Sequence, residues 1–334
     1  MISIFLYAFL ISLFTLILVI FLSHKYQLFI DDSNEKKPQN FHEKSTPRAG
    51  GLGILLGMSL LLVLPLGLKF FLSIFLAFLS GIVEDFHNSL SPKFRLSLQI
   101  AAAFFAIWLT NSVVTYLGLG INMPYWMGVI FSVFAIVGMM NAMNMIDGFH
   151  GLASGVILLI LLSFAIVSYR QDNLEILSIV IISLGATLGF FILNFPKGKI
   201  FLGDGGAYLL GFIVAIIGIF LASKYESVSP WYILAIFIYP VWEVVFSIIR
   251  RLVLGHSALG ADANHLHTLI YKHITHNNPL TTLLILVTTL PFMTIATIYP
   301  NLSKINLAVI CCFILFYSIF YHYLYKKEKK YLSR

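Results

Sequence analysis

Residues 124–151 read PYWMGVIFSVFAIVGMMNAMNMIDGFHG. An apolar run long enough to cross a membrane passes directly into Asn141, Asn144 and Asp147, which recur every three residues. Side chains at that spacing lie on roughly one face of a helix. The stretch therefore predicts a helix that leaves the bilayer with two amides and a carboxylate on one face. The plainer alternative is a polar helix C-terminus that ends in a turn at Gly148.

The composition extends this prediction to the whole chain. Of 334 residues, 59% are apolar and only 10% are charged, whereas soluble domains carry about 25% charged residues. Because so apolar a chain cannot cover a water-facing surface, we predict an all-α integral membrane protein, with residues 1–334 as a single multi-span domain in the lipid bilayer. The net charge of +7 is typical of Lys and Arg held on the cytoplasmic side of a membrane. No basic stretch interleaves with aromatic residues in a polar context, so no nucleic acid partner is expected.

The apolar runs predict the number of spans. A spanning helix needs about 20 mostly apolar residues. The first run, from Ile2 to Leu22, lacks a positively charged flank and an evident small-residue cleavage site, so we interpret it as an uncleaved span rather than a signal peptide. We predict eleven spans, at 2–22, 49–66, 69–84, 96–110, 124–141, 152–168, 174–193, 206–222, 231–249, 280–298 and 305–323.

Basic residues fall almost entirely between alternate runs. The odd-numbered connections and the C-terminal tail carry 17 Lys and Arg, and the even-numbered connections carry only 4. Because cytoplasmic loops hold the excess of Lys and Arg, the N-terminus is predicted to lie outside and the C-terminus in the cytoplasm. The distinctive polar residues lie in the same odd-numbered connections, so five polar segments are predicted to converge on the cytoplasmic face. These five loops, expected to form one site, are 23–48, 85–95, 142–151, 194–205 and 250–279.

Further carboxylates stand at predicted span ends. Glu84 and Asp85 lie at the end of the third span, and adjacent helical residues point about 100° apart, so both can reach one interfacial cavity. A solvated helix end is the alternative, since carboxylates there are costly unless solvated, paired or metal-bound. Asp204 lies in GDGG just before the eighth span, where glycines and a helix N-terminus can present N–H groups to phosphate. It can also be no more than an N-terminal cap.

Two histidines, His265 and His267, follow Asp262 in the last large loop. An i, i+2 pair does not share one helical face, so a loop or an extended segment is expected. The pair could bind a transition metal, but no third His or Cys has a fitting spacing. Asp and Asn oxygens dominate the other loops, which favours Mg²⁺, with Mn²⁺ as the alternative, and leaves the histidines to contact phosphate.

Taken together, these segments resemble the polyprenyl-phosphate N-acetylhexosamine-1-phosphate transferase family, the WecA/TagO-like group. The likeness runs from about Lys37 to His267 and includes KPQ with TPRAGG, Glu84-Asp85, NxxNxxDG from Asn141, FLGDGGA and the histidine loop. It implies a multi-pass enzyme of the bacterial inner membrane. The implied reaction transfers a sugar-1-phosphate, by default N-acetylglucosamine-1-phosphate, from a UDP-sugar to undecaprenyl phosphate, with Mg²⁺. UMP is released, and the product initiates a lipid-linked cell-surface glycan.

The resemblance also implies roles for single residues. Glu84 stands where Asp is usual, His150 where a second Asp is common, and Thr268 where a third His is expected. We expect His150 to contact the nucleotide-sugar rather than the metal. The implied catalytic residues are Asp85, Glu84 and Asp147, and the implied metal ligands are Asp204 and Asn144. The implied substrate-binding residues are Asn88, Asn141, His150, Lys93, Arg95, His265 and His267.

Several alternatives stay open on the sequence alone. The phospho-N-acetylmuramoyl-pentapeptide transferase branch is similar, but its histidine run is contiguous and its first loop differs from TPRAGG. A secondary transporter would hold polar groups near the bilayer midplane in broken helices with repeated halves, and a non-catalytic membrane scaffold is a third class. Asp85 can deprotonate the lipid phosphate or attack the UDP-sugar to form a covalent intermediate. The sugar, the downstream polymer and a homodimeric state are likewise undetermined.

The predicted orientation can be tested at the C-terminal tail, which carries Lys326, Lys327, Lys329 and Lys330. We expect a fused reporter that works only in the cytoplasm to be active there, because the basic tail is held on the cytoplasmic side. A reporter that is active only outside the membrane would refute the eleven-span arrangement.

Overall fold

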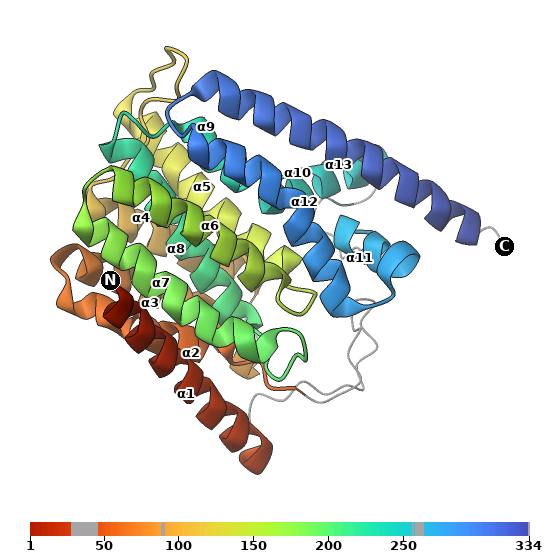
Figure 1. Ribbon diagram of the computed structural model, residues 1–334, viewed down its shortest axis with the longest axis horizontal. Helices are drawn as coiled ribbons and strands as arrows, with labels where there is room; N and C mark the ends of the chain where they lie inside the picture. The colour runs from red at the N-terminus through yellow and green to blue at the C-terminus, as the bar shows by residue number, and fades with distance from the viewer. Residues whose placement is uncertain (28–45, 88–90, 256, 258–263, 333–334) are drawn as a thin grey trace.

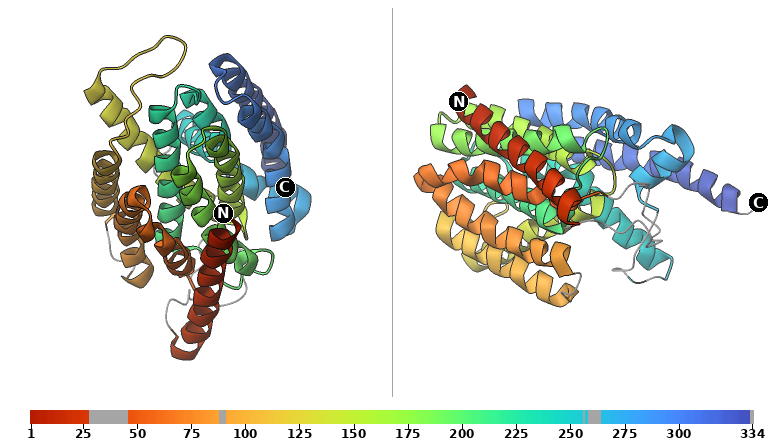
Figure 2. Two further views of the ribbon diagram at one scale, coloured as in Figure 1. Left: turned by 60° about the vertical axis from the view of Figure 1, so that its left-hand side comes forward. Right: turned by 90° about the horizontal axis from the view of Figure 1, so that it is seen from below.

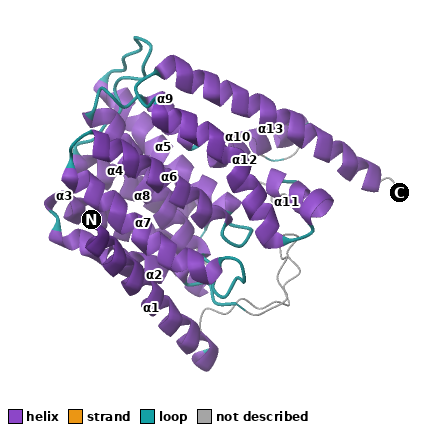
Figure 3. Cartoon of the chain, in the orientation of Figure 1, coloured by secondary structure: helices purple, strands orange, loops and turns teal. Residues whose placement is uncertain are grey.

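The structure is a computed structural model that describes residues 1–27, 46–87, 91–255, 257 and 264–332. Within these residues the chain is almost entirely helical, and two isolated β-bridges are its only strand-like pairings (Figure 3). The predicted all-α class is confirmed.

In the residues that the structure describes, the helices follow one another along the chain with loops and turns between them (Figure 1). The first half contains α1 (Ile2–Tyr26), α2 (Gly50–Gly57), the 3₁₀-helix η1 (Met58–Val63), α3 (Pro65–His87), α4 (Pro92–Thr110), α5 (Tyr125–Ile146) and α6 (Leu152–Arg170). The second half contains α7 (Leu174–Asn194), α8 (Gly203–Lys224), α9 (Pro230–Ile236), α10 (Ile238–Val253), α11 (Leu266–Ile270), the π-helical turn η2 (Tyr271–Thr275), α12 (Asn278–Ile298) and α13 (Ser303–Leu332).

Each predicted span corresponds to an apolar helical segment, but two of the segments are not straight spanning helices. Nine helices in the described part of the chain have the length and composition of a span, and α9 with α10 would make a tenth if their 78° bend lies within one span. The predicted span 49–66 is instead the 8-residue α2 followed by the 6-residue η1. Glycines make up much of α2 and weaken it as a helix. The chain is thus a multi-pass membrane protein, while the count of eleven and the orientation stay predictions.

Helix α8 is the centre of the bundle, and other helices surround it (Figure 2). Its spanning window is 94% buried, against 17% for α1 and 33% for α13. It packs against α3, α5 and α6 and against the short α2. Because α8 begins within GDGG, this central position fixes where the side chain of Asp204 leaves the bundle.

Small residues bring α2 and α3 into backbone contact with the start of α8. A Cβ placed on Gly81 of α3 would lie 2.5 Å from the carbonyl carbon of Asp204 and 2.5 Å from the backbone nitrogen of Gly205. A Cβ on Gly51 of α2 would lie 2.6 Å from the backbone of Gly206. Real Cβ atoms essentially never come within 3.0 Å of another heavy atom. Glycine therefore permits this approach, as small residues do at helix crossings in membranes.

The bend between α9 and α10 lies at Phe237, three residues before Pro240. Proline cannot donate a backbone hydrogen bond, and its ring clashes with the carbonyl four residues earlier, which belongs to Ile236, the last residue of α9. Helix α10 then runs at 78° to α9 and buries Tyr239, Glu243 and Ser247. Because of the bend, Glu243 of α10 lies in a different place from the one that a straight continuation of α9 would give it.

The close crossing of α3 and α8 predicts the effect of Gly81→Ala. The added methyl group meets backbone atoms that cannot rotate away, so we expect overpacking to lower the free energy of unfolding by about 1–3 kcal/mol. Thermal unfolding of the purified protein in detergent, followed by tryptophan fluorescence, measures the change. The matched control is Gly138→Ala in α5, where a Cβ meets nothing within 4 Å and alanine is the better helix former. Equal midpoints for the two variants would contradict the packing account.

Candidate active site

Asp85, at the end of α3, holds the first turn of α8. Its Oδ1 accepts the backbone N–H of Asp204 at 2.8 Å, and its Oδ2 accepts the N–H of Gly205 at 2.9 Å. Leu202, the residue before α8, offers no side-chain cap. Gly203 has a φ of 75°, and a Cβ there would lie 2.8 Å from Oδ2 of Asp85. Asp85 therefore supplies from another helix what an N-cap side chain normally supplies from its own.

Arg95 of α4 joins the carboxylates of two other helices. Its NH1 group donates to Oδ2 of Asp204 at 2.9 Å and lies 3.8 Å from Oε1 of Glu84. All three side chains are partly exposed. A guanidinium has five N–H donors in a fixed fork, so Arg95 can keep Asp204 in place and still meet an anionic ligand.

The TPRAGG segment runs beside the residues that lead into α8. The N–H of Phe201 donates to the carbonyl of Pro47 at 2.8 Å, and the N–H of Gly50 donates to the carbonyl of Phe201 at 2.9 Å. The resulting parallel bridge pairs Arg48 with Phe201. Arg48 thereby comes close enough to act electrostatically on Asp147. Two motifs far apart in the sequence are thus held together by their backbones.

Asp147, which directly follows α5, belongs to the same group of charges. Burial raises the pKa of its carboxyl well above the ordinary 3.8, the nearby carboxylates of Asp204 and Asp85 raise it further, and Arg48 opposes the shift. A carboxyl group with neighbouring carboxylates and a raised pKa is typical of a site that binds a cation or exchanges a proton.

The amides of the NxxN pattern tie α5 to its neighbours. Asn141 donates to Oε1 of Gln99 in α4 at 2.8 Å, and Asn144 donates its side-chain nitrogen to the hydroxyl of Tyr208 in α8 at 3.3 Å. The side-chain oxygen of Asn144 is then the atom that can face a ligand. Gln99 and Tyr208 were not predicted as site residues. The one available signal for Gln99 is a lone amide inside the apolar run 96–110.

His150 lies beside the loop that precedes α8. Its Nδ1 is 3.0 Å from the carbonyl oxygen of Pro196. Burial lowers the pKa of His150, and the contact with Pro196 opposes the shift, so the neutral ring predominates near pH 7. Asn194 fastens the same loop, since it accepts the N–H of Gly151 and donates to the carbonyl of Ile200. No sequence motif marks Asn194.

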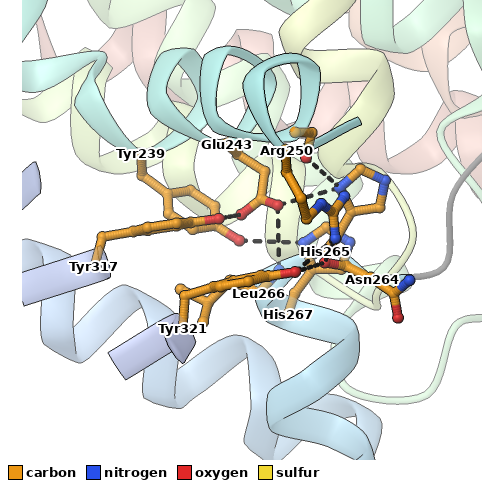
Figure 4. A network of polar contacts seen from close by, with 10 residues as sticks. Tyr239, Glu243, Arg250, Asn264, His265, Leu266, His267, Tyr317 and Tyr321 are labelled. Atoms are coloured by element: carbon orange, nitrogen blue, oxygen red, sulfur yellow. Dashed lines mark hydrogen bonds and ion pairs between the residues drawn. The ribbon is translucent and has the colours of Figure 1, made fainter. Parts of the chain in front are cut away.

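His265 and His267 are buried, at 5% and 3% exposed. Nδ1 of His265 lies 3.1 Å from Oε1 of Glu243, and Nδ1 of His267 lies 3.3 Å from the hydroxyl of Tyr239 (Figure 4). Burial lowers the pKa of His267 to about 3, against the opposing effect of Glu243, so this ring is neutral near pH 7. Glu243 was not predicted as a site residue.

Some predicted site residues are not tested by these contacts. Asn88, Asp262 and the first-loop residues before Thr46 lie outside the described residues. Lys93 is exposed in the first turn of α4. The described contacts join Glu84, Asp85, Arg95 and Asp204. Asp147 lies close enough to interact electrostatically with the carboxylates of Asp85 and Asp204.

The donor atoms here suit a Mg²⁺ ion held jointly by protein and substrate. No three His, Cys, Asp or Glu side chains converge on a metal position in the part of the chain that the structure describes. Mg²⁺ usually binds through one or two carboxylates, with waters and substrate phosphates as its other ligands. Asp204, Asp147 and the side-chain oxygen of Asn144 are hard donors of that kind. A cation would also relieve the repulsion that raises the pKa of Asp147.

Known proteins share this sequence pattern over most of the chain. Residues 68–222 match glycosyl transferase family 4. The probable undecaprenyl-phosphate N-acetylglucosaminyl 1-phosphate transferase of Bacillus subtilis (strain 168) is 29% identical over 286 residues, covering 78% of this chain and 75% of that protein. The undecaprenyl-phosphate alpha-N-acetylglucosaminyl 1-phosphate transferase of Thermotoga maritima is 30% identical over 292 residues, covering 86% and 88%.

A second group of relatives aligns over a shorter stretch. The phospho-N-acetylmuramoyl-pentapeptide-transferase of Streptococcus agalactiae serotype Ia is 34% identical over 186 residues, 54% of each chain. This chain therefore spans about half the length of that relative. The match to the T. maritima protein covers most of both chains, and the chain belongs to glycosyl transferase family 4. The predicted resemblance to polyprenyl-phosphate N-acetylhexosamine-1-phosphate transferases is confirmed.

Proposed function

We propose that this protein transfers N-acetylhexosamine-1-phosphate from a UDP-sugar to undecaprenyl phosphate at the cytoplasmic face of a bacterial inner membrane, releasing UMP. The observation that carries the proposal is the meeting of Glu84, Asp85, Arg95 and Asp204 at the start of a central membrane helix. Such a site lies where a water-soluble donor and a lipid acceptor can both reach it. The names of the two relatives matched over most of their length support the lipid and N-acetylglucosamine as the sugar.

The bond changes follow from the two substrates. An oxygen of the lipid phosphate forms a bond to the phosphorus that carries the sugar. The bond from that phosphorus to the oxygen shared with the uridine-linked phosphate breaks, and UMP leaves with the electron pair. The lipid phosphate is already largely ionised near pH 7, since its second pKa is about 6. Direct attack therefore needs little help from a base.

The described side chains support this route through charge and position. Asp85 uses both carboxylate oxygens to hold the first turn of α8, which favours a positioning role over a covalent one. Arg95 and Arg48 supply positive charge beside the carboxylates, where charge develops on the departing UMP. Asp147, with its raised pKa, can take up or release a proton as substrates bind and leave.

Mg²⁺ is part of the proposal. Asp204 and Asn144 would hold it, with Asp147 as a further oxygen donor, and the donor's diphosphate would complete its ligands. When bound, the ion would neutralise phosphate charge during transfer. The protein groups would keep the donor oriented beside it, with Arg95 anchored on Asp204 at 2.9 Å.

A second candidate donor is UDP-N-acetylmuramoyl-pentapeptide, which the streptococcal relatives suggest by name. The longer alignments with the N-acetylglucosaminyl enzymes favour the smaller sugar. The test is a panel of UDP-sugars, both donors included, mixed with the purified protein, undecaprenyl phosphate and Mg²⁺. We expect UMP release with UDP-N-acetylglucosamine. UMP release with the pentapeptide donor alone would move the protein to the other branch, and no UMP from any donor would refute transfer.

The metal assignment predicts the effect of Asp204→Asn. A neutral amide is a poorer ligand for a hard dication, so we expect at least a tenfold loss of transfer at limiting Mg²⁺, about 1.4 kcal/mol of barrier, and a weaker response to added Mg²⁺. The matched control is Asp172→Asn, an exposed residue beyond the end of α6, which should leave the Mg²⁺ titration unchanged. Wild-type transfer by Asp204→Asn at limiting Mg²⁺ would show that the assignment is wrong.

His150→Asp tests the predicted contact of His150 with the nucleotide-sugar. The neutral ring lies against the loop at Pro196, and a carboxylate there would repel the donor's diphosphate. We expect KM for the UDP-sugar to rise more than the Mg²⁺ requirement changes. Paired titrations of sugar nucleotide and Mg²⁺ on the variant measure both. A shifted Mg²⁺ dependence with unchanged KM would instead assign His150 to the metal.

A further inference from the structure

Glu243 is a fully buried carboxylate that the transfer chemistry above does not use. It lies on α10, just beyond the bend, and is 0% exposed. Three groups converge on it: Nδ1 of His265 at 3.1 Å and the backbone N–H of Leu266 at 3.2 Å on Oε1, and the hydroxyl of Tyr317 at 2.8 Å on Oε2 (Figure 4). A buried carboxylate is stable only when it is paired and hydrogen-bonded. Of the groups bonded to it, His265 alone can carry positive charge.

We propose that Glu243 is a positioning residue: it keeps a proton on Nδ1 of His265 and thereby presents Nε2 of that ring to the phosphate groups of the substrates. The inference rests on the proposed function, because the substrates of that reaction carry the phosphate groups that His265 would contact. The contact between the ring and the carboxylate can still be tested without any substrate.

The hydrogen bonds decide where the proton sits on His265. Leu266 and Tyr317 both donate to Glu243, so the carboxylate acts as an acceptor on each oxygen. An ionised carboxylate has no proton to give. Nδ1 of His265 must therefore be the donor in its contact with Oε1 at 3.1 Å, and the hydroxyl of Ser247, 3.2 Å from the same Nδ1, is a second acceptor within reach of that N–H. Nε2 is left on the far edge of the ring. A carboxylate behind an imidazole fixes the tautomer and stabilises the charged ring in many enzymes.

Ring contacts link the histidine pair to the segment that carries Asp147. The rings of His265 and His267 stack with centroids 5.2 Å apart and planes 11° apart. The ring of Phe149, which lies between Gly148 and His150 in the chain, meets His267 edge-on at 5.4 Å. His267 thus separates His265 from Phe149, and the pair borders the segment that carries Asp147.

Three side chains of the C-terminal helix α13 contact Glu243 or the stretch 264–273. Tyr317 donates to Glu243, and Tyr321 donates to the carbonyl of Asn264 at 3.1 Å. Further along α13, Glu328 lies 2.8 Å from the ammonium of Lys272 and 2.7 Å from Nε2 of His273. Tyr321 and Glu328 thus contact the stretch 264–273, which includes His265 and His267, and Tyr317 is linked to it through Glu243. Helix α13 therefore stabilises the positions of Glu243 and of the stretch 264–273.

The first experiment observes the tautomer directly. The full-length protein is labelled with [¹⁵N]histidine in lipid nanodiscs, and the signals of His265 are assigned by their loss in His265→Gln. We expect Nδ1 of His265 to be protonated in the wild type. In Glu243→Gln one acceptor oxygen faces three donors and an amide adds two more, so the Nδ1-protonated population should fall. A wild-type His265 with an unprotonated Nδ1 overturns the proposal.

The second experiment measures transfer. We expect Glu243→Gln to reduce kcat/KM by about 10–100-fold, as removal of a carboxylate behind a functional imidazole does elsewhere, and Glu243→Asp to restore part of it. Tyr317→Phe, which removes one hydrogen bond and keeps the ring, should cause a smaller loss in the same direction and covers the case in which Glu243→Gln does not fold. The matched controls are Glu226→Gln, an exposed carboxylate, and Tyr323→Phe, an exposed tyrosine of α13.

The outcomes separate the two claims. Unchanged kcat/KM in both Glu243→Gln and Tyr317→Phe overturns the positioning role while the proposed function stands. If the wild type releases no UMP from any donor, the proposed function fails. The histidine spectra then still decide whether Glu243 holds the Nδ1 proton of His265.

Discussion

The first turn of α8 depends on a carboxylate from another helix. Every helix begins with N–H groups that lack an intrahelical partner, and a buried N–H group left unsatisfied costs about 1–3 kcal/mol. Leu202 provides no cap for α8, so the carboxylate of Asp85 accepts two of these N–H groups. That contact requires α3 to approach α8 closely, which Gly81 and Gly203 allow.

The same contact explains why the charged residues gather at one place. Once α3 and α8 are joined, Glu84 and Asp204 lie on either side of Arg95, and the pairing of Arg48 with Phe201 adds a second cation. Arg95 pairs with both Glu84 and Asp204, and carboxylates at the end of a membrane helix are costly unless they are paired, solvated or metal-bound. The arrangement is thus both the cap of a buried helix and a set of groups suited to phosphate chemistry.

Much of this could be predicted from the sequence, because spans and loop motifs are local signals. Apolar runs marked where the helices lie, and the acidic and amide motifs marked Asp85, Asp204 and Asn144. The predicted second span, 49–66, is the short α2 followed by the 3₁₀-helix η1, a change of helix type that hydropathy does not register. Glu243 was missed because it sits inside an apolar run, 22 residues before its histidine partner. The pairing depends on the bend before Pro240 and on the packing of α13, and neither is visible as a periodic pattern in the sequence.

The central claim is that a sugar phosphate, rather than a sugar alone, moves to the lipid. It is tested most directly with UDP-N-acetylglucosamine that carries ³²P in either of its two phosphates, mixed with the protein, undecaprenyl phosphate and Mg²⁺. The account predicts that label next to the sugar appears in the lipid product and that label next to uridine appears in water-soluble UMP. Release of labelled UDP from both preparations, with no label on the lipid, would contradict it.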